Sequence, residues 1–365
     1  MAASATRQAL QEAWTRRGLL AWLLWPASLL YGSLWQLRQW LFRVGLRSVH
    51  RAGVPVIVVG NVVAGGAGKT PIVIALVQHL QALGLRPGVV SRGYGRATRD
   101  CRLVDADALP DDVGDEPLLI RRRTAAPVCV ARSRIAAARA LLAAHPDLDL
   151  LICDDGLQHR ALHRDIEVCV FDERGIGNGF LLPAGPLREP WPRHADLLVV
   201  SGDPALCGAF HHTHRALASH AVRMDGSTLD LQTLVQPAIG PLARPIVAVA
   251  GTAQPHVFFG MLRSRGVMLG ETRALPDHAP FEATQWAGPA DNTLLCTEKD
   301  AVKLWRHRPD ALAVPLLVHL DPPFWAALRK LLHLRGTPQI RAKLQSMDGH
   351  TPTATAGLPG HQGLA

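Results

Sequence analysis

The chain has 365 residues, enough for one large or two medium domains with hydrophobic cores. Its 39 Lys and Arg against 30 Asp and Glu give a formal net charge of +9, which indicates an anionic partner: a nucleic acid, an anionic membrane surface or a phosphorylated substrate. The six cysteines are scattered and form no C-x-x-C pair, which argues against disulfides and a zinc site and favours the cytosolic side.

The first segment of the chain differs in kind from the rest. The stretch "GLLAWLLWPASLLYGSLWQL" (18–37) carries no charge and is rich in tryptophan, and about twenty apolar residues can cross a bilayer. Pro26 and Gly32 interrupt it, and arginines flank both ends, a pattern typical of an interfacial helix. We expect residues 1–45 to form a membrane-associated helix that spans the bilayer or lies in one leaflet; a buried core helix is the alternative.

Beyond residue 45, apolar strand-like runs alternate with helical patterns. This β-α-β order predicts a doubly wound parallel sheet with ligands at the carboxyl ends of its strands. The expected strands are 54–60, 86–91, 148–155, 165–172 and 195–202, and the expected helices are 70–80 and 133–145.

A second α/β portion is expected to begin at 244–251 and to run through 292–305 to 315–320. We therefore divide the chain beyond the first helix into a main domain (46–205), a smaller α/β domain with a C-terminal helix (206–345) and a disordered tail rich in Gly, Pro and Thr (346–365). The cluster His211, His212 and His214 is interpreted as a solvated loop.

The glycine run in "GNVVAGGAGKTP" (60–71) predicts a phosphate-binding loop. Such a loop needs backbone N–H groups turned inward, a helix amino terminus behind them, a lysine, and a hydroxyl for magnesium. The glycines give backbone freedom, and a buried strand precedes the run while a helix follows it. The loop consists of Gly65, Gly66, Ala67, Gly68, Lys69 and Thr70.

The apolar strand "LLICDDG" ends in Asp154 and Asp155. Adjacent carboxylates at a strand end, near phosphate and lysine, can hold magnesium directly or through water. The residues leave open which of the two does so, and an acidic turn after the strand is the structural alternative.

Three further segments lie at the ends of the predicted strands or between them, and we do not interpret them as ordinary connections. They are "VSRGYGR" (90–96), "GDEP" (114–117), whose Asp115 and Glu116 we expect in a loop, and "GNGFLLPAGPLREP" (177–190). Long irregular loops at strand ends usually serve binding or chemistry.

These segments, together with "DDGLQHRALHRDIEV", "LPDH" and "TEKDAVK", resemble in their order the tetraacyldisaccharide 4′-kinases, the lipid A 4′-kinases of Gram-negative bacteria. The resemblance runs from the aromatic N-terminal helix to about residue 320 and leaves the tail uncovered. The phosphate loop of that family lacks the first glycine of the pattern G-x-x-x-x-G-K-[ST] and usually has a small hydroxyl residue there. This chain has Val63 at that position.

The resemblance implies a P-loop NTPase-like fold in which residues 46–205 are the kinase core. It implies transfer of the γ-phosphate of ATP to the 4′-hydroxyl of a tetraacylated glucosamine disaccharide 1-phosphate in lipid A biosynthesis, with Mg²⁺ as cofactor. Lys69 and the loop glycines would hold phosphates, and Thr70 with Asp154 or Asp155 would hold magnesium.

The resemblance also assigns roles outside the phosphate loop. Asp115 matches the proposed base of the family and His278 its supporting partner, since an imidazole can orient a carboxylate and share its proton. Glu189 would add a carboxylate to the metal shell, and Arg92 would contact phosphate.

Three other functions explain the sequence less completely. A membrane-associated P-loop ATPase acting as a nucleotide switch is the alternative from the same fold; a guanine-reading N-K-x-D is absent from the sequence. A nucleic-acid binder should carry a basic helix or interleaved aromatics, whereas the aromatics here gather in the first helix. The hypothesis of a structural membrane adaptor does not explain the Gly-Lys-Thr sequence or the Asp-Asp pair. We therefore expect the lipid substrate and a membrane surface as partners at the cytoplasmic face of the inner membrane, with no nucleic acid and no obligate protein partner.

Overall fold

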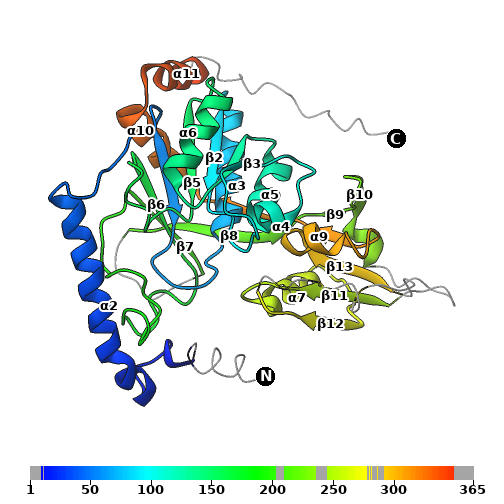
Figure 1. Cartoon of the computed structure of the whole chain (residues 1–365). Coiled ribbons are helices and arrows are strands. Elements are labelled where there is room, and N and C mark those ends of the chain that lie inside the picture. Colours follow the sequence, from blue (N-terminus) through cyan, green and yellow to red (C-terminus); the bar gives the residue numbers. More distant parts are fainter. Residues whose placement is uncertain are drawn as a thin grey trace, which may run out of the picture.

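A computed structural model describes residues 10, 12–202, 209–235, 245–277, 279, 281, 286 and 292–348. Two sheets organise this part of the chain, and a long N-terminal helix lies along the side of the larger one, away from the smaller (Figure 1). The predicted α/β class with a second, smaller sheet is confirmed.

The larger sheet is a doubly wound, mostly parallel sheet of nine strands in the described residues. Its first strand, β1, lies between β5 and β6 and pairs in parallel with both. Only the two edge strands, β3 and β15, pair antiparallel. Across the sheet the order is β15 (Leu316–Leu320), β8 (His211–Leu217), β7 (Leu197–Ser201), β6 (Ile166–Phe171), β1 (Val56–Gly60), β5 (Leu150–Asp154), β2 (Pro87–Ser91), β4 (Val128–Val130) and β3 (Arg102–Leu103).

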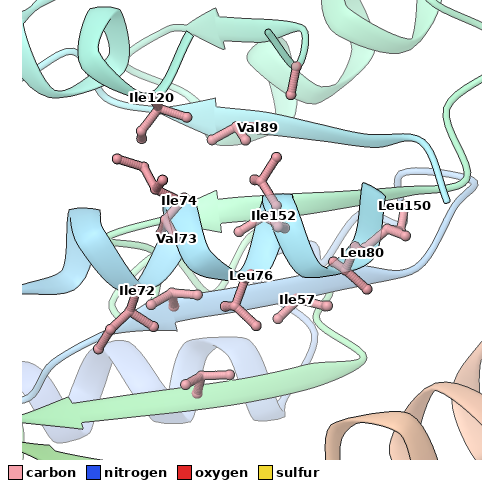
Figure 2. Packing of buried hydrophobic residues seen from close by; sticks show 14 of the residues in the cluster. Ile57, Ile72, Val73, Ile74, Leu76, Leu80, Val89, Ile120, Leu150 and Ile152 are labelled. Atoms are coloured by element: carbon pink, nitrogen blue, oxygen red, sulfur yellow. The ribbon is translucent and has the colours of Figure 1, made fainter. Parts of the chain in front are cut away.

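Apolar side chains from both faces of this sheet are buried under helices, which is why its central strands are apolar throughout. Helix α3 (Lys69–Ala82) packs Ile72, Val73, Leu76 and Leu80 onto the strands, as Figure 2 shows. The same face is covered by α5 (Asp115–Thr124), α10 (Pro322–Arg335) and α11 (Pro338–Asp348), and the opposite face by α6 (Arg134–Ala144); α4 (Pro110–Val113) is a single turn before α5.

The smaller sheet has six strands in the described part of the chain. Its order is β10 (Thr228–Asp230), β9 (His220–Val222), β14 (Leu312–Val314), β13 (Thr293–Thr297), β11 (Ile246–Ala250) and β12 (Glu271–Ala274), with α7 (Pro255–Ser264), α9 (Glu298–Leu304) and the 3-10 turn η1 (Leu231–Leu234) beside it.

The described residues between 206 and 345 are distributed over both sheets, whereas the sequence pattern predicted all of them in the smaller domain. The histidine-rich segment predicted as a loop is β8, and it pairs with β15 at the edge of the larger sheet. Phe324 and Leu328 of α10 and Ile340 of α11 are buried in the core of the larger domain. An apolar run in the sequence predicts a buried segment, but it does not predict the sheet to which that segment belongs. The C-terminal helix also extends to Asp348, into the predicted tail, and residues 349–365 lie outside the described residues.

The N-terminal helix α2 (Leu19–Arg43) has two unlike faces. Ala21, Ser28, Gly32 and Gln39 are buried, while most of the leucines and tryptophans between them are exposed; Leu23, for example, is 78% exposed. In the part of the chain that the structure describes, no helix combines the length and apolarity that crossing a bilayer requires.

The buried face of α2 is fixed by polar contacts to the segment 177–190. The Ser28 hydroxyl donates to the carbonyl of Leu181 (2.8 Å) and accepts from the N–H of Ala184 (2.9 Å). The Tyr31 hydroxyl donates to the carbonyl of Arg188 (2.7 Å). The helix is therefore docked on the loop that also carries Glu189.

Candidate functional site

The glycine run forms a loop between β1 and the first turn of α3. Gly68 caps the helix with φ 72° and ψ 31°, a left-handed conformation that favours glycine. The glycine also lies against the end of a long side chain, because a Cβ at this position would be 2.4 Å from Nη2 of Arg215. Lys69 and Thr70 thus open the helix, whose free N–H groups and dipole favour an anion.

The start of the loop is held by the segment 177–190. The N–H of Ala64 donates to the carbonyl of Pro186, and the N–H of Arg188 donates to that of Val62, both at 2.7 Å. Val63 lies between these bonds, is 3% exposed and makes a bridge to Leu187. Its apolar side chain belongs to the core beneath the loop.

Lys69 lies among groups that fix its position. Its Nζ donates to Oδ1 of Asn61 (3.1 Å) and is 3.4 Å from Oδ1 of Asp155. Nη1 of Arg188 is 3.2 Å from the same carboxylate oxygen of Asp155. The amide of Asn61 in turn donates to the carbonyls of Val63 (2.6 Å) and Gly65 (3.4 Å), so it connects the lysine to the loop backbone.

Asp154 and Asp155 adjoin in sequence but occupy opposite electrostatic environments. Burial raises the pKa of Asp154 to about 7, and the negative charges of Glu116 and Asp155 act in the same direction. Burial also acts to raise the pKa of Asp155, but the cations Lys69, Arg188 and Arg134 outweigh it and lower that pKa. Asp155 is thus the ionised partner of Lys69.

The carboxylate of Asp154 is only half satisfied. The Ser91 hydroxyl donates to its Oδ2 (3.1 Å), from the carboxyl end of the neighbouring strand β2. Its buried Oδ1 has no hydrogen-bond partner among the residues that the structure describes. A buried, unsatisfied carboxylate oxygen is a natural ligand for a cation, because the cation removes the cost of desolvating the charge.

Two other predicted site residues border this group. Glu189 is 2% exposed and accepts from Nε2 of Gln158 (2.8 Å), and Nη1 of Arg193 lies 3.4 Å from it. Its proposed place in a metal shell therefore stays a prediction. Arg92 follows β2 and is exposed, and its charge helps to lower the pKa of His159, after the larger effects of burial and of Arg134.

A protein-only metal centre is not present in the described residues: no group of three or more His, Cys, Asp or Glu side chains there could hold a metal ion. Magnesium does not require one, since it usually retains several waters and binds one or two carboxylates plus phosphate oxygens. Asp154 and the buried Thr70 are suited to this mode of binding.

"GDEP" does not form the expected loop: Asp115 is the first residue of α5. Gly114, at φ 93°, turns the chain into the helix, and carboxylates in the first turn interact favourably with its dipole. Asp115 is 3% exposed, and its Oδ2 lies 3.1 Å from Nζ of Lys303 in α9. The predicted base thus lies where the two sheets meet.

A second lysine of α9 binds the neighbouring residue. Nζ of Lys299 is 3.2 Å from Oε1 of Glu116 and 3.0 Å from Oδ1 of Asp277. Burial alone would lower the pKa of Lys299, but the carboxylates Glu116, Asp277 and Asp115 raise it. His278 lies outside the described residues, so its pairing with Asp115 stays a prediction.

Several functional neighbours escaped the sequence analysis. Asn61 and Glu116 lie inside the motifs "GNVVAGGAGKTP" and "GDEP", but the sequence alone assigned them no role. Lys299 and Lys303 of "TEKDAVK" are four residues apart on α9, so they share one helix face, and this spacing was the available signal. Arg174, whose Nη2 donates to the carbonyl of Gly66 (2.9 Å), had no signal in the sequence.

The chain is similar in sequence to known proteins of one enzyme family. The sequence model of the LpxK family, tetraacyldisaccharide-1-P 4′-kinase, matches residues 20–333. A tetraacyldisaccharide 4′-kinase of Acidovorax sp. (strain JS42) is 56% identical over 322 residues, which cover 87% of this chain and 93% of that protein. That of Polaromonas naphthalenivorans (strain CJ2) is 52% identical over 357 residues, covering 95% of this chain and 100% of the relative.

The fold is also similar to a solved structure. LpxK from Aquifex aeolicus, crystallised in complex with ATP, superimposes with a TM-score of 0.74 at 27% sequence identity. The similarity covers 87% of this chain and 100% of that one.

The raised pKa of Asp154 predicts how the stability of the fold depends on pH. The folded protein holds this proton up to about pH 7 and the unfolded chain only to 3.8, so ionisation of Asp154 destabilises the fold as pH rises through that window. Asp154→Asn should therefore raise the melting temperature at pH 8 in the presence of a chelator. The corresponding gain in the free energy of unfolding is at most about 4 kcal/mol, and it should shrink toward pH 4.

Thermal melts at several pH values measure this effect. Asp147→Asn is the control, because the hydrogen bond from Arg86 lowers the pKa of that exposed carboxylate. A melting temperature of Asp154→Asn at or below that of the wild type at pH 8 would contradict the prediction.

Proposed function

Because the chain belongs to the tetraacyldisaccharide 4′-kinase family, we propose that it transfers the γ-phosphate of ATP to the 4′-hydroxyl of a tetraacylated glucosamine disaccharide 1-phosphate, a step of lipid A biosynthesis. One observation carries this for the chain itself: Lys69, held by Asn61 and Asp155, opens a helix and acts by its charge on Asp154, whose buried Oδ1 has no hydrogen-bond partner in the described part of the chain. Phosphoryl transfer needs such positioned charge more than it needs covalent chemistry.

Lys69 and the N–H groups of the loop bind the phosphates of the nucleotide. Their positive charge stabilises negative charge that develops on the phosphoryl oxygens during transfer. Arg188 and Asp155 hold the lysine in place, because the ion pairs of Asp155 with both cations fix its carboxylate.

Magnesium fits the residues present. Asp154 would hold it with the unsatisfied Oδ1, and Thr70 with its hydroxyl. The ion would supply charge neutralisation to the phosphates. Its binding would also favour the ionised form of Asp154, whose pKa burial has raised.

Asp115 accepts the proton of the attacking hydroxyl. It lies at the amino terminus of α5, and Glu116 beside it is close enough to Asp154 to raise the pKa of that residue. Nζ of Lys303 lies 3.1 Å from Oδ2 of Asp115 and holds this buried carboxylate in position. His278 is proposed to support it.

The exposed face of α2 binds the membrane surface. Most of its leucines and tryptophans are exposed, and arginines flank the helix at both ends, as in helices that lie in the interface. A substrate with several acyl chains stays in the bilayer, so the enzyme must reach its sugar from the surface. The cytoplasmic face of the inner membrane is the side that offers ATP.

The reaction is tested directly with labelled ATP, magnesium and the tetraacylated disaccharide 1-phosphate. Wild-type protein should produce labelled lipid, and Lys69→Ala should lower kcat at least a hundredfold because it removes phosphate charge stabilisation. Lys343→Ala, which breaks a surface ion pair with Asp149, is the control with the same charge change. ATP hydrolysis without labelled lipid would favour the nucleotide switch instead.

Asp115→Asn should lower kcat for lipid phosphorylation by about 10²–10⁴, the usual contribution of a general base. Binding of ADP should stay near the wild-type value, since the phosphate loop is unchanged. Asp111→Asn serves as the control. Asp111 also forms an ion pair, with Arg306 just after α9, but its side chain is exposed. Normal transfer by a folded Asp115→Asn protein would remove Asp115 as the base.

Leu23→Glu with Leu30→Glu should weaken binding to vesicles that contain anionic lipid by tenfold or more, because each change removes an apolar side chain from the α2 surface and adds a repelled charge. Leu334→Glu, 66% exposed on α10, is the matched control. Vesicle sedimentation measures binding, and transfer to detergent-dispersed substrate checks the active site. Unchanged sedimentation of the double variant would place the membrane contact elsewhere.

A further inference from the structure

Arg215, on strand β8, is an arginine that the family motifs do not include. Its guanidinium lies against the last glycine of the phosphate loop: a Cβ at Gly68 would meet Nη2 at 2.4 Å and Cζ at 3.1 Å. The surrounding contacts agree, because Arg215 pairs with Val318 of β15, and Val318 lines the same cavity as Pro71 of α3.

This guanidinium has no partner of its own in the described part of the chain: no hydrogen bond or ion pair engages it there. Two carboxylates act on it through their charge, but both are committed elsewhere. Asp172 accepts from Nε (2.9 Å) and Nη2 (2.6 Å) of Arg174, and Glu173 accepts from Nε2 of Gln254 (3.1 Å).

Leaving a guanidinium desolvated and unpaired is costly, and here burial lowers the pKa of Arg215. Arginines in such positions are usually completed by a carboxylate or phosphate, whose oxygens match the planar fork of N–H donors. At the amino terminus of α3, where the helix already favours an anion, the missing partner is a phosphate group.

The sheet order indicates which phosphate. Asp154 and Ser91 end β5 and β2, on one side of β1, whereas β6, β7 and β8 lie on the other side. A nucleotide whose γ-phosphate is directed to Asp154 and Asp115 for transfer therefore extends its remaining phosphates toward Arg215.

We propose that Arg215 binds the α- and β-phosphates of the nucleotide, which are the two phosphates that ATP and ADP share. The inference rests on the proposed function, in which ATP is the phosphate donor. It assigns Arg215 to affinity for the nucleotide and not to the transferred group.

Equilibrium binding of ADP and ATP, with magnesium and without lipid, tests the assignment. Arg215→Met should weaken both nucleotides to the same extent, by about tenfold to a hundredfold, the usual loss for one charge-assisted contact. Arg215→Lys, which keeps the charge but not the fork, should weaken both by less. Arg223→Met, in the β9–β10 turn of the smaller sheet, removes the same charge and should bind as the wild type does.

The other outcomes are equally distinct. Unchanged ADP affinity in Arg215→Met would overturn the proposal, even if ATP alone bound less well, because the contact would then involve the γ-phosphate. The nucleotide-free Arg215→Met protein should melt no lower than the wild type, since no partner is lost; a lower melting temperature would reveal a structural role and also overturn it. Failure of the wild type to bind ADP or ATP would contradict the proposed function itself.

Discussion

Two backbone hydrogen bonds between the phosphate loop and residues 186–188 connect the parts of the site. Because Arg188 is anchored there, its side chain reaches Asp155, which in turn fixes Lys69. The other side of the same segment carries α2 through Ser28 and Tyr31. The apolar helix and the nucleotide site therefore share one irregular loop, and its length and low regularity follow from having to satisfy both.

The contacts between the larger domain and α9 combine ion pairs with apolar packing, since Val302 of α9 is buried in the core of the larger domain. Lys303 with Asp115, Lys299 with Glu116 and Arg123 with Glu298 all join α5 to the helix at the end of β13. These side chains are largely buried, so each carboxylate depends on its cationic partner, and loss of one partner would leave a buried charge uncompensated.

The sequence predicted those features that depend on local pattern. Buried parallel strands are apolar throughout, and a phosphate loop needs glycine and lysine at fixed spacing, so the larger sheet and Lys69 could be located in advance. The sheet to which β8 and β15 belong could not, since pairing joins segments about a hundred residues apart. The same holds for Lys299 and Lys303, because a lysine on a short helix gains a role only from the carboxylates that tertiary packing brings to it.

The electrostatics of the loop explain why both a cation and an anion are needed to complete it. On one side of α3, Asp154 keeps a buried carboxylate oxygen that has no hydrogen-bond partner among the described residues, and on the other, Arg215 keeps its guanidinium beside Gly68. Neither can relieve the other, because the helix amino terminus lies between them. A magnesium nucleotide, the proposed ligand, carries its cation at one end of the phosphate chain and anionic oxygens along the rest, so it would satisfy both groups at once and in only one direction.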